Sequence, residues 1–259
     1  MSETPVEYSG TGTEADPLTF STRQSAPDQV GAVIAGLAST TKEYAAGFRA
    51  NADLSGNLPA DIRGIVSDAS GAITGTLSTA YNARVKADSF RNDRSLYPEG
   101  RKLLAGEVVN AAIDEVTESF EHADAQIEVA SALTFEAARP RISPDDAMPA
   151  RADLAMMLGR HDGNPAGLGD TLKRLAQRSD GVGALVADPS YLGDVLDARG
   201  ADAALREAIL TIVGAEVVKA AAKSGDPKRA AAARTNLALA ELRKARIAAS
   251  SFTRHTLQR

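Results

Sequence analysis

The sequence predicts an all-α protein, and three observations support this prediction. The chain is 44% hydrophobic but only 4% aromatic and has no Trp, so Ala, Leu, Val and Ile must build its core. Alanine and leucine favour helices, whereas sheets favour β-branched and aromatic residues. Long stretches carry apolar residues at helical spacing, and no series of alternating strands occurs. We expect an elongated helical bundle with one long central helix, a smaller helical subdomain and an extended N-terminal arm.

Residues 1–27 form the expected arm. They are rich in Ser, Thr, Gly and Pro and show no sustained periodicity, which predicts an extended or disordered segment. Within them, "PLTFST" has the composition of a short strand. Such an arm can lie along a neighbouring subunit in an assembly.

Two helices are expected next, within a long-helix bundle over residues 28–140. Asp28 suits the N-cap of the first helix, and "SGNLP" ends that helix. Pro59 suits the first position of the second helix. Its glycines each cost about 1 kcal/mol relative to Ala, so tertiary packing must hold this helix together.

The longest helix is expected from Pro98 to Ala138, because Pro140 and Pro144 cannot continue it. At about 100° per residue its apolar positions form one stripe: Val109, Ala112, Ile113, Val116, Phe120, Ala123, Ile127 and Ala130. Its acidic residues fall on the opposite side: Glu107, Asp114, Glu118, Glu121 and Glu128. A helix of this length is typical of bundles and oligomers.

Residues 141–200 are expected to form a subdomain of short helices, because Gly and Pro punctuate them repeatedly. Residues 201–259 are expected to form a helical pair that ends in a basic terminal helix. Gly225 suits a C-cap and Asp226 an N-cap between the two helices.

The residue types that carry chemistry are scarce. The chain has no Cys, and its three histidines, His122, His161 and His255, fall in different expected elements. Glu118 and His122 lie one helical turn apart, but a helical di-metal site needs Glu-x-x-His pairs on two helices. An exposed ion pair or hydrogen bond explains this pair better.

No other motif anchors an active site. "RHDGN" at residues 160–164 is typical of a turn, and Asp145 and Asp146 are typical of the acidic residues at a helix start. The glycine-containing loops match no phosphate-binding pattern, and no Gly-x-Ser-x-Gly elbow occurs. We therefore expect no catalytic residue, no cofactor, no metal and no enzymatic activity.

Charge is unevenly distributed along the chain. The net charge is −5, but residues 223–259 carry +7, which leaves −12 on residues 1–222. This asymmetry suggests a terminal segment with a partner of its own. On a helix from Lys228, basic residues gather on one side and apolar residues on the other. The expected contact residues are Lys228, Arg229, Arg243, Lys244, Arg246 and Arg254.

Three interpretations of this basic stripe remain: solvated surface, contact with protein, and contact with nucleic acid. Charged helix faces are often simply solvated. Protein contact, including contact with the acidic side of the long helix in a neighbouring copy, is the favoured functional interpretation. Nucleic acid is the alternative, although no aromatic residues interleave with the cations and no DNA-reading module is recognisable.

The Cys-free, acidic, Ala-rich helical texture, with its long central helix and the terminal segment "PKRAAAARTNLALAELRKARIAA", resembles tailed-phage virion structural or assembly proteins. The resemblance implies a non-enzymatic protein that self-associates and contacts partner proteins such as a coat or portal-type protein. Capsid-associated, connector and scaffolding roles all fit. The many short helices between residues 148 and 200 depart from a rod-like scaffold.

The location expected from the sequence is intracellular during assembly, with the virion as the second possibility. The N-terminus has no basic stretch followed by an apolar run, so we expect no secretion signal. No apolar run approaches the length of about 20 residues needed to span a membrane.

Overall fold

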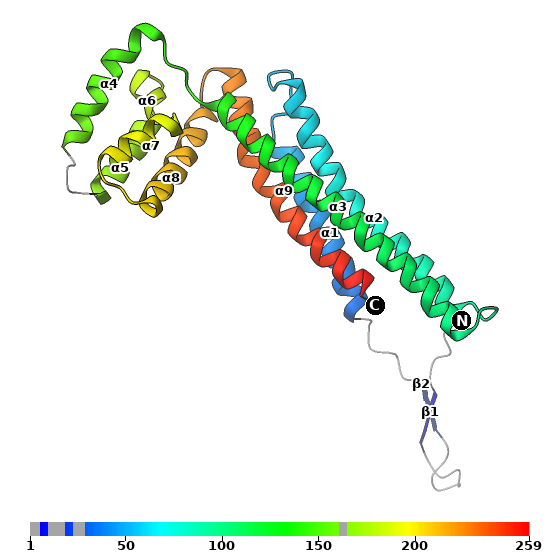
Figure 1. Cartoon of the computed structure of the whole chain (residues 1–259). Helices are drawn as coiled ribbons and strands as arrows, with labels where there is room; N and C mark the ends of the chain where they lie inside the picture. Colours follow the sequence, from blue (N-terminus) through cyan, green and yellow to red (C-terminus); the bar gives the residue numbers. More distant parts are fainter. Residues whose placement is uncertain (1–5, 10–18, 23–28, 161–164, 259) are drawn as a thin grey trace.

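The computed structural model describes residues 6–9, 19–22, 29–160 and 165–258 (Figure 1). Helices dominate the part of the chain that the structure describes, which confirms the all-α class. A short antiparallel pair of strands, β1 (Val6–Ser9) and β2 (Thr19–Thr22), precedes the helices. The strand expected within "PLTFST" corresponds to β2. The rest of the expected arm, including the N-cap expected at Asp28, lies outside the described residues.

Four long helices lie side by side and share one core (Figure 1). Phe48, Ile73, Phe120 and Leu242 are among the buried side chains at its centre. Burying each such side chain contributes about 1.5–3 kcal/mol, so this core is a main source of stability. The four helices are α1 (Gln29–Asn51), α2 (Ala60–Asn92), α3 (Pro98–Ala138) and α9 (Pro227–Leu257).

Helix α3 begins and ends where the prolines predict. Pro98 occupies its first turn, and Ala138 is its last residue before Pro140. The predicted apolar stripe is buried or half-buried except at Ile113, which is 43% exposed. Ile113 is exposed because it lies level with the end of α9 and opens onto a groove there. All five acidic residues predicted on the other side are exposed.

Helix α9 is the fourth helix of the bundle. It packs against α1, α3 and α2, and 15 of its residues are buried. Most of these are alanines, whose small side chains let neighbouring helices approach closely. The segment expected as a helical pair, 201–259, is therefore divided: α8 (Ala203–Ala221) packs mainly on the short helices, while α9 completes the bundle.

The short helices form a second core with α8. Leu154, Leu172, Leu196 and Val213 lie at its centre. Side-chain caps fix where several of these helices begin, because an oxygen of Ser143, Asp180, Asp188 or Asp202 accepts a backbone N–H of the first turn. The helices are α4 (Pro144–Gly159), α5 (Pro165–Ala176), α6 (Gly181–Val186) and α7 (Pro189–Ala198).

Two expected caps differ from the structure, and one agrees. Pro59 precedes α2 as its N-cap residue, so the first helical residue is Ala60. Helix α8 ends at Ala221 with Ala222 as C-cap, so Gly225 lies in the loop beyond the helix end. Asp226 caps α9 as predicted: its Oδ1 accepts the backbone N–H of Lys228 at 2.9 Å.

Within the described ranges, every helix is too short or too polar to cross a lipid bilayer.

Candidate interaction surface

Two of the six predicted contact residues are engaged by neighbours within the chain through simple polar contacts. The Nε of Arg229 donates to the carbonyl oxygen of Ala138, at the end of α3, at 3.1 Å. The Nζ of Lys244 lies 2.9 Å from Oε1 of Glu241 and 5.6 Å from the ring centroid of Tyr44. The hydrogen bond to Glu241, followed by the charge of Glu241, raises the pKa of Lys244.

A third predicted contact residue, Arg246, links α9 to α3. Its Nη2 lies 3.0 Å from Oδ2 of Asp124, and its Cζ lies 3.8 Å from the ring centroid of Phe120. Its side chain is only 23% exposed. Arg229 and Arg246 thus link α9 to α3, a role that the sequence did not reveal, whereas the ion pair of Lys244 lies within α9.

The other three predicted contact residues, Lys228, Arg243 and Arg254, are exposed. None of them forms an ion pair with any residue that the structure describes. At about 100° and 1.5 Å per residue, they occupy an arc of about 80° along about 39 Å of α9. Arg246 falls in the same arc, so the arc lies on the shoulder of α9 next to α3. We call these three residues the basic row.

A matching set of anions runs along α3. Each is exposed, and none forms an ion pair within the described part of the chain. They also occupy an arc of about 80°, along about 31 Å of helix. Asp124, which pairs with Arg246, lies close to this arc, so the arc borders the side of α3 that meets α9. We call the set the acidic row: Glu107, Asp114, Glu118, Glu121 and Glu128.

The register between the two helices is fixed by polar contacts. The Nδ2 of Asn236 donates to the carbonyl oxygen of Ser131 at 3.0 Å and to Oγ1 of Thr134 at 2.8 Å. Together with the Arg246–Asp124 pair, these bonds make α3 and α9 antiparallel. Arg254 then lies level with Asp114. Arg243 lies level with the segment of α3 between Glu121 and Glu128, near its Glu128 end.

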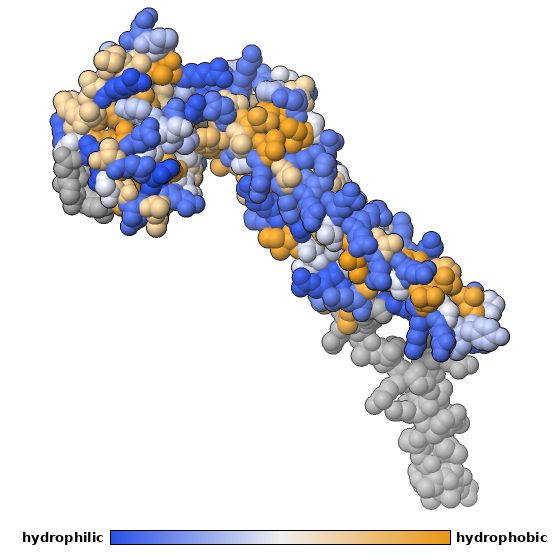
Figure 2. Space-filling model, viewed as in Figure 1, coloured by the Kyte–Doolittle hydropathy of each residue, from blue (hydrophilic) through white to orange (hydrophobic). Residues whose placement is uncertain are grey.

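The two rows therefore share one side of the molecule, which we call the α3–α9 side. Figures 1 and 2 look onto it: α3 and α9 run next to each other, and the surface over them is largely hydrophilic with separate apolar spots. Ile247 on α9 is 68% exposed. A groove of about 250 Å³ lies where α9 ends against α3, and Ile113, Phe120, Arg254 and Leu257 help to line it.

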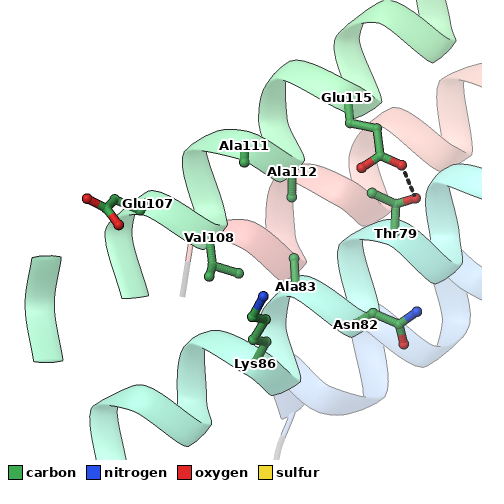
Figure 3. Close-up of a pocket in the computed structure, with 9 residues that line it drawn as sticks. All are labelled: Thr79, Asn82, Ala83, Lys86, Glu107, Val108, Ala111, Ala112 and Glu115. Atoms are coloured by element: carbon green, nitrogen blue, oxygen red, sulfur yellow. Dashed lines mark hydrogen bonds between the residues drawn. The ribbon is translucent and has the colours of Figure 1, made fainter. Parts of the chain in front are cut away.

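A second groove, of about 490 Å³, lies between α2 and α3 (Figure 3). Ala83, Ala112 and Val108 form its apolar floor, and Lys86 reaches across that floor toward α3. The Oγ1 of Thr79 donates to Oε1 of Glu115 at 3.1 Å. This hydrogen bond links α2 to α3 at the groove.

The residues that the sequence analysis considered for metal binding or acid–base chemistry lie at separate places in the structure. Glu118 and His122 are both exposed on α3. Asp145 lies in the first turn of α4, where its backbone N–H donates to Ser143 Oγ. Three or more potential metal-binding side chains do not cluster anywhere in the described ranges. His161 and the "HDGN" turn lie outside the described residues.

No protein-family model, curated protein or solved structure matches this chain. The likeness to tailed-phage proteins consequently stays a prediction from the sequence.

Proposed function

We propose that this chain is a non-enzymatic structural or assembly protein that self-associates and contacts partner proteins through its α3–α9 side. One observation carries the proposal: a basic row and an acidic row run side by side on adjacent helices, and neither is neutralised by ion pairs within the described chain. Such rows suit a partner that presents the opposite pattern, because complementary charge sets orientation and partner choice.

The proposal includes the elongated shape of the bundle that the sequence predicts. Long helices packed side by side provide an extended, stiff surface rather than an enclosed site. A phage capsid-associated, connector or scaffolding role, with a coat or portal-type partner, suits such a surface. That role places the protein inside the cell during assembly or in the particle itself.

Nucleic acid is the alternative partner, and it has weaker support. Three unpaired cations spread over about 39 Å make a sparse phosphate-binding surface, and the acidic row beside them repels phosphate. Binding of DNA that weakens steeply with added salt would favour this alternative.

Light scattering coupled to size-exclusion chromatography tests the proposal. At low salt the full chain is expected to elute with a mass that is a multiple of 26.9 kDa. The mass should fall toward that of the single chain near about 1 M salt, where the Debye length is about 3 Å. A mass of one chain at every protein concentration and at low salt contradicts the proposal.

A further inference from the structure

We propose that two copies of this chain pair face to face through the α3–α9 side, related by a two-fold axis parallel to the helices. Arg243 and Arg254 of each copy then lie against the acidic row of the other copy. The inference rests on the proposed function, self-association, and names the surface, the symmetry and the register of that association.

Charge selects the direction of the axis. A two-fold axis makes the same patch of both copies meet, so the patch must be complementary to itself. An axis across the helices would set α9 against α9 and α3 against α3, which opposes like charges. An axis along the helices sets α9 of each copy against α3 of the other. Only this second arrangement brings the basic row onto the acidic row.

The register within one chain makes the match position-specific. A two-fold axis along the helices keeps every residue at its own level, so each residue of α9 meets the part of α3 that is level with it in its own chain. Arg254 therefore meets Asp114 of the other copy. Arg243 meets the segment between Glu121 and Glu128. This alignment follows from the Asn236 and Arg246 contacts that fix the helices within the chain.

The same side also supplies apolar area. Ile247 is 68% exposed and Ile113 is 43% exposed, and Ile113 opens onto the groove at the end of α9. Two helices, each about 10 Å wide, along the 31 residues of α9 offer a face on the order of 900 Å² at about 1.5 Å per residue. A standard interface buries about 800 Å² on each partner, so the face is large enough.

The test uses charge reversal and the molar mass of the full chain. Variant A carries Arg243→Glu and Arg254→Glu, and variant B carries Asp114→Lys, Glu121→Lys and Glu128→Lys. All five side chains are exposed and form no ion pair with described residues, so the fold should tolerate both variants. Like charges then face each other in either homodimer, and we expect the dissociation constant to rise about 100-fold.

Mixing A with B is the decisive arm. In a mixed pair every reversed row meets a row of opposite charge, so A and B are expected to form a 1:1 complex although each is monomeric alone. A third variant that combines all five substitutions should regain the homodimer, because the substituted residues of its two rows again face opposite charges. The axis along the helices predicts this recovery, whereas an axis across them predicts none.

The control carries Lys42→Glu and Arg49→Glu, which change the net charge as much as variant A does. Both side chains are exposed and lie on α1, which contributes to neither row. This control is expected to dimerise like the unaltered chain. If the control loses its dimer as variants A and B do, or if A and B dimerise like the unaltered chain, the proposed interface is wrong although the chain still self-associates. A monomeric unaltered chain would instead remove the proposed function.

Discussion

Arg246 in α9 and Asp124 in α3 lie 122 positions apart in sequence, and their contact joins the two helices. The Nη2 of Arg246 lies 3.0 Å from Oδ2 of Asp124, and its Nε donates to the same oxygen at 3.2 Å. The guanidinium also covers the Phe120 ring. This contact explains why Arg246 has a structural role while Arg243, three positions earlier, forms no ion pair with any described residue.

Arg246→Ala is expected to lower the free energy of unfolding by about 1–2 kcal/mol, because it removes the ion pair, the cation–π contact and the packing of the side-chain stem. Urea unfolding followed by circular dichroism measures this change. Arg243→Ala is the matched control, because Arg243 is exposed and forms no ion pair with described residues. Its effect should stay within about 0.5 kcal/mol. Equal effects of the two substitutions would contradict the structural role of Arg246.

A chain that ends at Ser224 is expected to lose the folded bundle. The deletion removes α9 with its 15 buried residues and exposes the apolar sides of α1, α2 and α3. Far-UV circular dichroism and limited proteolysis of the truncated chain should show reduced helix and rapid cleavage within residues 29–138. A protease-resistant, helical truncated chain would mean that α9 is peripheral.

Glycine substitutions should separate crowded from open positions. A Cβ at Gly183 would lie 2.1 Å from the carbonyl oxygen of Arg178, so Gly183→Ala must shift the backbone and should destabilise the protein by about 1–3 kcal/mol. A Cβ at Gly75 meets nothing within 4 Å, and Gly75 lies inside α2. Gly75→Ala should therefore stabilise the protein by up to about 1 kcal/mol. Thermal unfolding of the two variants tests both signs.

Stability should fall in acid partly through Asp180. Burial alone would raise the pKa of Asp180, but hydrogen bonds from Arg178 and from the Gly183 N–H, with the Arg178 charge, hold that pKa below its usual value. The charged form is thus favoured by folding. Its contribution is fully present above the unfolded pKa of about 3.9, and it is lost as pH falls through the lower folded pKa.

Asp180→Asn keeps a cap acceptor for Gly183 but removes the charge. The difference in unfolding free energy between this variant and the unaltered chain should therefore shrink between about pH 5 and pH 2. Asp194→Asn, at an exposed position, serves as the control. A difference that stays constant over this pH range would show that the charge of Asp180 contributes nothing.

Local sequence signals predicted the helices well. The bounds of α3 follow from Pro98 and Pro140, and the start of α9 follows from Asp226 and Pro227, because caps and prolines act within one turn. The grouping of the acidic row on one side of α3 was also predictable, because it follows from the helical period alone. Ile113 belongs to the predicted apolar stripe but is 43% exposed, because its exposure depends on where another helix ends.

The parts that could not be predicted depend on contacts between distant segments. Arg243 and Arg246 look alike in sequence, but only Arg246 has an acidic partner, and that partner lies in α3. The place of α9 in the bundle has the same origin. Its alanines indicate close packing, but the composition does not say which helices pack on it.

Distances between spin labels distinguish the two possible dimer axes, since a chain without Cys accepts a single labelled cysteine at any position. Lys228→Cys and Gln258→Cys place labels near opposite ends of α9, and each variant is measured alone by double electron–electron resonance. Pairing about an axis along the helices predicts a short distance for both variants, on the order of 15–30 Å from helix packing. Pairing about an axis across the helices runs the two copies of α9 in opposite directions. In at least one of the two variants, the labels on the two copies would then lie about 40 Å or more apart. That result, or the absence of any intermolecular distance at low salt, would contradict pairing about an axis along the helices.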